Sequence, residues 1–130
     1  KIIEPVNLYN CSIGDNSFIG PFVEIQKNVK IGKNCRVQSH SFICENVNIG
    51  DNCFIGHGVN FINDKLTDKQ LNRDSKNFLK TNISDNVKIG SNSTILPVNV
   101  NENVVIGAGS VVTKNCKKNS IYFGNPAKKK

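Results

Sequence analysis

Residues 31–59 read IGKNCRVQSHSFICENVNIGDNCFIGHGV, and an aliphatic residue recurs in this stretch at every sixth position. The aliphatic residues are Ile31, Val37, Ile43, Ile49 and Ile55, and the fifth place of each six-residue block holds a small or β-branched residue. A fixed internal period is typical of a repeat protein, in which each unit packs only on its neighbours. The stretch therefore predicts a solenoid.

The same period extends over most of the chain. Gly fills the second place of the blocks seven times, and Gly and Asn both tolerate the left-handed backbone of tight turns. An apolar pair followed by a polar turn predicts short strands joined at corners, with Ile and Val stacked in one interior column. Fourteen blocks begin with Ile or Val, at residues 13, 19, 25, 31, 37, 43, 49, 55, 83, 89, 95, 100, 106 and 112. Asn fills the fourth place nine times, at Asn16, Asn28, Asn34, Asn46, Asn52, Asn86, Asn92, Asn103 and Asn115.

The composition of the 130-residue chain limits what its partners can be. A length of 130 residues predicts one domain, and no apolar run approaches the roughly 18 residues of a membrane span. The net charge of +7 comes partly from lysines near the C-terminus, where no aromatic residues interleave with them in the way expected of a nucleic-acid surface. We therefore expect a cytoplasmic protein that binds neither membranes nor nucleic acid.

The five cysteines read mainly as small core residues. Cys35, Cys53 and Cys116 occupy the inward fifth place, and Cys11 has the same phase when the repeat is extended backwards. Cys44 alone is expected at a turn. A cytosolic chain of this kind needs no disulfide bonds.

The spacing of the blocks predicts three departures from a regular solenoid within a single domain, residues 1–130. Residues 1–12 form an N-terminal cap, and residues 118–130 form a C-terminal segment. The interval between Phe61 and Ile83 is 22 residues, one block plus 16, which predicts an extruded loop at residues 63–80. Long loops on rigid scaffolds usually carry function.

The only two histidines are expected at one corner of the solenoid. His57 lies 17 residues from His40 and 18 from Ser39, and three blocks of six residues make one coil, so the two histidines should occupy adjacent coils. Any polar residue would suit an exposed turn. Histidine is nevertheless the side chain best suited to move protons near neutral pH, so both are candidate catalytic residues.

A second group of polar residues is expected at the next corner. Glu45 and Asn63 are 18 residues apart and should stack, with Asp64 beside them at the root of the loop. Taken singly, each could be an ordinary solvated residue. Taken with the loop, they form a candidate binding site.

The repeated [Ile/Val]-Gly-x-Asn-[small]-x pattern resembles the hexapeptide repeat of acyltransferases that fold as a left-handed parallel β-helix. This resemblance implies an all-β fold of about five coils. The segments QSHSFICE, FIGHGVNFIND, ILPV, VIGAGSVVTK and GNPAK resemble, more narrowly, the small trimeric N-acetyltransferases of nucleotide-linked amino sugars, such as the 3-amino-3,6-dideoxyhexose type. The loop matches that group poorly, which leaves a 4-amino acceptor open.

The resemblance implies acetyl-CoA as co-substrate, no metal, and a homotrimer with its sites between subunits. The Ala108–Gly109 turn would let the backbone approach the pantetheine, because only small residues allow close contact. The remaining cofactor-binding residues implied by the resemblance are Lys114, Asn125, Pro126, Ala127 and Lys128. The implied acceptor-binding residues are Glu45, Phe61, Asn63 and Asp64.

The chemistry expected of such an enzyme is attack of a neutral sugar amine on the thioester carbon. His40 is the first candidate for the base and His57 the second, although a substrate-assisted reaction with no side-chain base is also open. An O-acetyltransferase of a sugar or small alcohol is the main alternative. A γ-carbonic anhydrase, which binds zinc through three histidines, and a structural β-helix fit less well.

Overall fold

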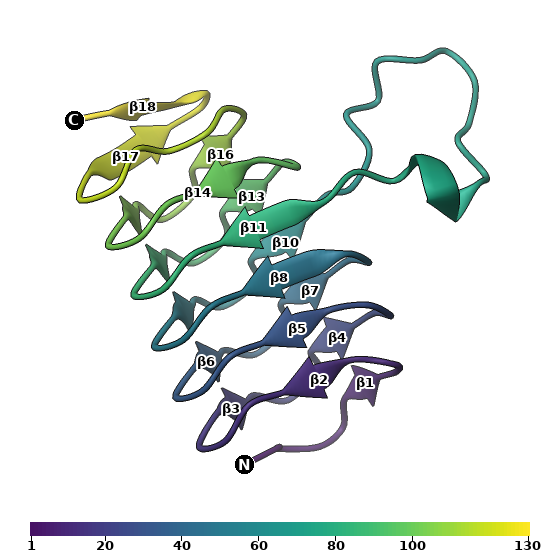
Figure 1. Cartoon of the computed structure of the whole chain (residues 1–130), viewed down its shortest axis with the longest axis vertical. Coiled ribbons are helices and arrows are strands. Elements are labelled where there is room, and N and C mark those ends of the chain that lie inside the picture. Colours follow the sequence, from purple (N-terminus) through teal and green to yellow (C-terminus); the bar gives the residue numbers. More distant parts are fainter.

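The computed structural model describes all 130 residues, and the chain winds as a three-sided parallel β-helix with its termini at opposite ends (Figure 1). The strands are two to four residues long, and those on each side form one sheet that runs along the helix axis. All neighbouring strands pair in parallel except β17 and β18. The all-β parallel β-helix predicted from the repeat is confirmed.

The three sheets together contain all the strands. Sheet 1 contains β1 (Asn7–Leu8), β4 (Glu24–Ile25), β7 (Phe42–Ile43), β10 (Asn60–Phe61), β13 (Thr94–Ile95) and β16 (Val111–Val112). Sheet 2 contains β2 (Ser12–Ile13), β5 (Lys30–Ile31), β8 (Val47–Ile49), β11 (Thr81–Ile83) and β14 (Asn99–Val100). Sheet 3 contains β3 (Phe18–Ile19), β6 (Arg36–Val37), β9 (Phe54–Ile55), β12 (Lys88–Ile89), β15 (Val105–Ile106), β17 (Ile121–Gly124) and β18 (Ala127–Lys129).

The pairing register fixes the length of a coil at 18 residues over the first part of the helix. Lys30 pairs with Asn48, and Arg36 pairs with Phe54. Across the loop, Asn48 pairs with Asn82. The spacing between these two residues is one coil plus the 16 additional residues that the sequence predicts. The loop therefore leaves the helix and returns to it without disturbing the stack.

The first and fifth residues of the blocks form the interior. An isoleucine or valine at the first place is 0–3% exposed in every block except the first, whose Ile13 lies near the N-terminal end and is only partly buried. Burial of these side chains removes apolar surface from water at about 25 cal/mol per Å², which stabilises the stack. The prediction of one interior column is confirmed.

The turns use the left-handed backbone that the recurring asparagines indicate. Eight of the nine predicted turn asparagines have φ between 57° and 66°, namely Asn16, Asn28, Asn34, Asn46, Asn52, Asn86, Asn92 and Asn103. Asn115 is the exception: its φ is not positive, and its side-chain Oδ1 accepts a hydrogen bond from the backbone N–H of Asn99 at 2.8 Å.

Two late corners are shorter than the others, and they change the predicted phase of two residues, Val98 and Cys116. Val98 is 6% exposed and packs inward, so it is not a turn residue. Cys116 bridges Val100, which places it in the column of first-place residues and not at the fifth place. The physical reason is the same for both corners. Each lacks the left-handed residue. The corner after Ile95 is one residue short, which advances Val98 by one place, and the corner after Val112 is two residues short, which advances Cys116 by two places.

The N-terminal segment, expected as a cap, follows the path of the β-helix. Ile2 bridges Ile19, and β1 pairs with β4, so residues 1–12 follow the same helical path. The helix therefore has about six turns, one more than the sequence predicts. The additional partial turn covers a strand edge that would otherwise present unpaired backbone groups.

The loop between β10 and β11 projects well beyond the helix (Figure 1). It contains a single 3₁₀ turn, η1 (Ser75–Asn77), which Asp74 caps by accepting a hydrogen bond from the backbone N–H of Lys76 at 3.0 Å. No helix in the structure has the length and apolar character needed to cross a membrane.

Thr81, where the chain re-enters the helix, has an unsatisfied hydroxyl. Its side chain is 0% exposed, and Oγ1 has no hydrogen-bond partner. Core serines avoid this penalty: Ser41 Oγ donates to the Gly56 carbonyl at 2.8 Å and accepts from the Val59 N–H. Because Thr81 pairs with Val47, a valine should fit its place.

We expect Thr81→Val to stabilise the protein by about 1 kcal/mol, since it removes a buried, unpaired hydroxyl and keeps the side-chain shape. Thermal unfolding should show a rise in Tm of about 4 °C. The matched variant Ser41→Ala should lower Tm, because it deletes a hydroxyl that is fully hydrogen-bonded. An unchanged or lower Tm for Thr81→Val would contradict this interpretation.

Cys44 is buried and not at an exposed turn as the sequence predicts. Its side chain is 2% exposed, and burial raises the pKa of the thiol to about 12. At pH 8 the thiolate fraction is on the order of one in ten thousand, so we expect Cys44 to resist alkylation by iodoacetamide in the folded protein. Peptide mapping by mass spectrometry should find it labelled only after denaturation. Equal labelling rates in native and denatured protein would be inconsistent with this burial.

Candidate functional site

The turns between sheet 3 and sheet 1 stack along one edge of the helix, which we call the histidine corner (residues 21–22, 39–40, 57–58, 91–92 and 108–109). In four successive coils, a backbone N–H in the turn donates to a carbonyl in the preceding turn at 2.8–3.2 Å. Neighbouring strands of a sheet lie about 4.8 Å apart. Side chains in adjacent turns of this corner are therefore held within contact distance of one another.

Both histidines lie on this corner and are exposed, but their surroundings differ. The Nδ1 atom of His57 lies 2.9 Å from the hydroxyl Oγ of Ser39, one coil away, and its backbone N–H donates to Ser91 Oγ at 3.1 Å. The ring of His40 instead stacks on Phe22, with 4.9 Å between ring centroids. The hydrogen bond with Ser39 orients the His57 ring, leaving Nε2 free toward solvent.

Two aromatic residues on this corner occupy left-handed turn positions, a backbone conformation that is unfavourable for bulky side chains. Phe22 has φ of 62° and His40 has φ of 64°, at the place where most other turns carry Asn or Gly. A bulky residue in the left-handed region costs on the order of 1 kcal/mol, and such outliers gather at functional sites. Phe22 is also 58% exposed, so its ring is not required by the core.

The predicted cofactor-binding turn lies on the same corner, near its C-terminal end. Gly109 has φ of 69°, and a Cβ atom added to it would meet no atom within 4 Å. Packing therefore does not demand a glycine here, and an asparagine, as at Asn92 one coil below, would satisfy the backbone equally well. The missing side chain leaves open surface beside Ala108, which is exposed.

The C-terminal hairpin of β17 and β18 continues this corner by one more level. Its turn contains Asn125 and Pro126, joined by a cis peptide bond, and the Gly124 N–H donates to Ser110 Oγ at 3.2 Å. The structure thus brings this turn next to the Ala108–Gly109 turn.

The other three predicted cofactor residues are placed differently. Ala127 packs against the core, and Lys128 is exposed on β18. Lys114 follows β16 and lies at the next corner, so the structure separates it from the hairpin.

The corner between sheet 1 and sheet 2, from which the loop leaves, holds the predicted acceptor residues. Glu45 and Asn63 line one cavity of about 420 Å³, together with Phe78 from the returning part of the loop. The Glu45 side chain is 16% exposed, and its Oε1 lies 3.9 Å from Lys27 Nζ. The predicted stacking of Glu45 and Asn63 is therefore present as a shared cavity wall.

Phe61 and Asp64, the other two predicted acceptor residues, are placed differently from Glu45 and Asn63. Phe61 is 1% exposed and takes the place of an Ile in the interior column, pairing in register with Ile95. Its side chain is therefore mainly a core residue, and Phe61 also borders the cavity beside Glu45. Asp64 turns back on the loop, where Oδ1 accepts a hydrogen bond from the Leu66 N–H at 2.9 Å.

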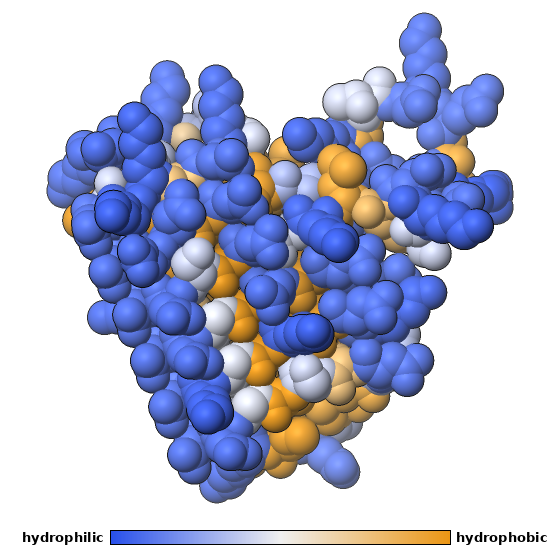
Figure 2. Space-filling model, viewed as in Figure 1, coloured by the Kyte–Doolittle hydropathy of each residue, from blue (hydrophilic) through white to orange (hydrophobic).

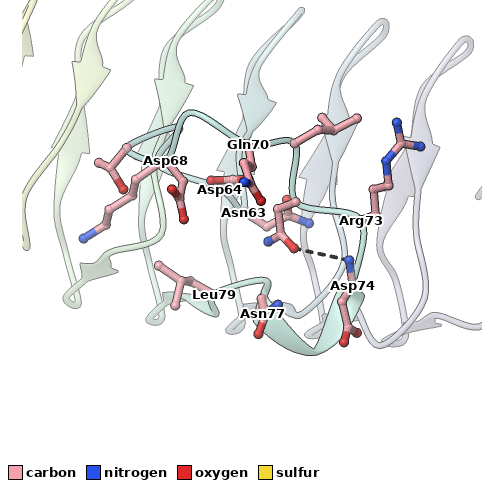
Figure 3. Close-up of a pocket in the computed structure, with 12 residues that line it drawn as sticks. Asn63, Asp64, Asp68, Gln70, Arg73, Asp74, Asn77 and Leu79 are labelled. Atoms are coloured by element: carbon pink, nitrogen blue, oxygen red, sulfur yellow. Dashed lines mark hydrogen bonds between the residues drawn. The ribbon is translucent and has the colours of Figure 1, made fainter.

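A second cavity, of about 500 Å³, lies within the loop itself (Figure 3). Its wall consists of residues 63–79 alone, and Arg73 points away from the other labelled side chains (Figure 3). Asn72 Oδ1 accepts from the Asp74 N–H at 3.2 Å. Asn63 borders both this cavity and the one beside Glu45.

The two groups of predicted site residues are not brought together within one chain. His40 and Glu45 lie in the turns at opposite ends of β7, on two different corners of the helix, and the five residue steps between these positions span up to about 16 Å. A general base must lie within about 3 Å of the proton that it removes. A single subunit therefore cannot place its own histidine corner against an amine held by its own Glu45.

Sequence reasoning did not single out Ser39 as a partner of histidine, or Phe22 and Phe78 as wall residues. The 18-residue spacing between Ser39 and His57 could have indicated that these two side chains lie in adjacent coils and form a pair. Nothing in the periodicity predicts Phe78, because the path of the loop does not follow the repeat. No group of three or more His, Cys, Asp or Glu side chains is close enough to hold a metal ion.

Comparison with solved structures shows the same fold in several acyltransferases. A mutant of AntD, an N-acyltransferase from Bacillus cereus solved with dTDP and coenzyme A, superposes with a TM-score of 0.86 at 24% identity, covering 95% of this chain and 75% of that one. A hexapeptide-repeat acetyltransferase from Vibrio cholerae, solved with acetyl coenzyme A, gives a TM-score of 0.79 at 22% identity, covering 91% of this chain and 68% of that one.

A longer protein also shares the fold. PerB from Caulobacter crescentus, solved with CoA and GDP-perosamine, gives a TM-score of 0.81 at 16% identity, covering 96% of this chain. This chain spans about half the length of PerB, 54%. No curated protein sequence matches the chain.

Two family models match the repeats themselves. The bacterial transferase hexapeptide model, described as six repeats, matches residues 10–45. The model for the hexapeptide repeat of succinyl-transferase matches residues 46–59 and 80–114, on either side of the loop. Together they cover the helix apart from its two ends, and they agree with the register of the strands. The chain therefore belongs to the hexapeptide-repeat acyltransferases.

Proposed function

We propose that this protein transfers the acetyl group of acetyl-CoA to the amino group of a nucleotide-linked amino-deoxysugar. The observation that carries the proposal is the histidine corner, where an oriented, exposed His57 shares one edge with the open Gly109 turn and the C-terminal hairpin. Two proteins of the same fold support the proposed donor and acceptor. AntD was solved with dTDP and coenzyme A, and PerB was solved with CoA and GDP-perosamine.

The proposed reaction begins with loss of a proton from the sugar ammonium, because only the neutral amine is a nucleophile. His57 is our choice of base, since the Ser39 hydroxyl fixes its ring, while His40 forms part of the adjoining wall. The amine nitrogen then bonds to the thioester carbon, the carbon–sulfur bond breaks, and coenzyme A leaves as the thiol. The backbone N–H of Ala108, which donates to no other group in the chain, is a candidate donor to the oxyanion.

A complete site then requires more than one subunit. Because about 16 Å separates the histidine corner from Glu45 in one chain, we propose a homotrimer in which the histidine corner of one subunit faces the loop corner of the next. Each interface would supply a base from one side and Glu45 and Asn63 from the other. This arrangement also explains why neither group of residues forms an enclosed pocket in a single chain.

We also propose a cytoplasmic location for the protein. All five cysteines are free thiols, and four of them are buried. Such thiols persist in reducing compartments.

The first test measures release of free thiol from acetyl-CoA with a panel of nucleotide-linked 3-amino and 4-amino deoxysugars. Each variant introduces a residue that the repeat already uses at the same place, so we expect both variants to fold. His57→Ser introduces the residue found at Ser39 and Ser91 of the adjacent coils, and His40→Asn introduces the common turn residue. We expect turnover with an amino sugar, and a fall in kcat of about 100-fold or more for His57→Ser.

The same assay separates the alternatives. Turnover that survives both substitutions would indicate a substrate-assisted reaction. Turnover with hydroxyl acceptors alone would replace the proposal with O-acetylation, and no turnover with any acceptor would contradict acetyl transfer altogether.

A second test concerns the open turn. Gly109→Asn keeps the left-handed backbone and meets no atom of the protein, but it fills the free surface. We expect an unchanged Tm and a KM for acetyl-CoA raised by about tenfold, which corresponds to roughly 1.4 kcal/mol of lost binding. Asn103→Gly, a change of turn side chain in the same coil but at another corner, serves as the control. An unchanged KM for Gly109→Asn would place acetyl-CoA elsewhere.

A further inference from the structure

Three cavities join into one band beneath the returning part of the loop, residues 75–80. The cavity beside Glu45, of about 420 Å³, shares Glu45 and Phe78 with a cavity of about 300 Å³ at the corner itself. That cavity in turn shares Asn28, Asn46 and Lys80 with a cavity of about 400 Å³ on sheet 2. We call this band, which passes from sheet 1 around the corner to sheet 2, the loop-corner groove.

The two ends of the groove differ in chemistry. The sheet 1 end combines the Glu45 carboxylate with Asn63 and the aromatic side chains of Phe42 and Phe78. The rest of the groove is lined by lysines and asparagine amides and has no carboxylate other than Glu45. The lysines are Lys27 and Lys30 from the coil and Lys76 and Lys80 from the loop.

Most of this positive charge is uncompensated. The one ion pair in the structure joins Lys27 to Glu45. Lys30, Lys76 and Lys80 are exposed and have no carboxylate within ion-pair distance. Three ammonium groups around one groove repel each other, and an anion placed among them would relieve that repulsion. Figure 2 shows that hydrophilic residues make up most of the surface of the loop and of the neighbouring part of the helix, with a few apolar residues among them.

We propose that the lysine-lined part of the loop-corner groove binds the diphosphate of the nucleotide-linked sugar. This inference rests on the proposed function and adds to it the site and direction of the acceptor. In a nucleotide sugar the diphosphate is attached directly to the sugar. A diphosphate held by Lys30, Lys76 and Lys80 therefore places the sugar at the sheet 1 end, where Glu45 faces its amine.

The arrangement assigns separate tasks to the loop and the coil. Lys76 and Lys80 approach the diphosphate from the loop, and Lys30 approaches it from β5, so the ligand bridges the two. The amides of Asn46, Asn48 and Asn82 supply neutral donors along the same wall. Asn48 and Asn82 lie in pairing register on adjacent strands, so the nucleoside leaves along sheet 2, away from the amine.

Calorimetric titration with dTDP, UDP and coenzyme A tests the site, because all three probes carry a diphosphate. Lys76→Gln and Lys80→Gln remove a charge and keep most of each side chain. Lys88→Gln, on β12 of sheet 3, removes an exposed lysine outside the groove and serves as the matched control.

We expect each groove variant to weaken binding of the tighter nucleoside diphosphate by about tenfold, the loss of one charged hydrogen bond, and to leave coenzyme A binding unchanged. The control should change neither. Unchanged nucleoside diphosphate affinity in both groove variants, weakened coenzyme A binding instead, or no binding of dTDP or UDP to the wild type would each overturn the proposal.

Turnover separates this inference from the proposed function. Acetyl transfer to an amino sugar with an unaltered acceptor KM in Lys80→Gln would keep the function and reject the groove. If the wild type transfers acetyl to no amino sugar, but Lys80→Gln loses nucleoside diphosphate binding, the groove would remain a nucleotide site and the proposed function would be rejected.

Discussion

The structure depends on one constraint, the in-register pairing of each coil with the next. Parallel backbone hydrogen bonds hold each residue of the early coils beside the residue 18 positions further on, and the buried Ile and Val column fixes which residues face inward. A slip of one residue would turn an apolar side chain out and a polar one in, so the register is strongly specified. Every side chain is thus placed by its phase in the repeat, and a site can be built by changing single residues at one corner.

Departures from the repeat occur mainly at two corners. The histidine corner carries Phe22 and His40 in left-handed turns, and the loop corner carries the insertion and both shortened turns. The third corner, between sheets 2 and 3, keeps its asparagines throughout, from Asn16 to Asn119. The regular corner maintains the helix, and the two irregular corners carry the candidate chemistry. A heterologous contact between copies would bring these two irregular corners together.

The scaffold and the loop contribute different properties to the proposed site. The coil holds His57, Ser39 and Glu45 through ladders of backbone hydrogen bonds, which suits residues that must be positioned to within tenths of an ångström. The loop joins the helix at its root, where the Leu79 N–H donates to the Asn63 carbonyl at 3.0 Å. Its Leu66 and Leu71 side chains are largely exposed. Specificity for the acceptor is therefore the property that the loop is best placed to supply.

The sequence by itself determined the fold, the 18-residue register, eight left-handed turns and the 16-residue excess of the loop, because the hexapeptide period reports the phase of each residue directly. It also placed the two histidines on one corner. Where the period fails, the predicted phase was wrong: Val98 packs inward and is not a turn residue, and Cys116, buried as expected, lies at the first place and not the fifth. Only the tertiary structure decided that Ser39 orients His57, that 16 Å or so separates the base from Glu45, and that lysines of the loop and coil line one groove. These relations join residues whose distance depends on the path of a loop and on contacts across coils, which no local period encodes.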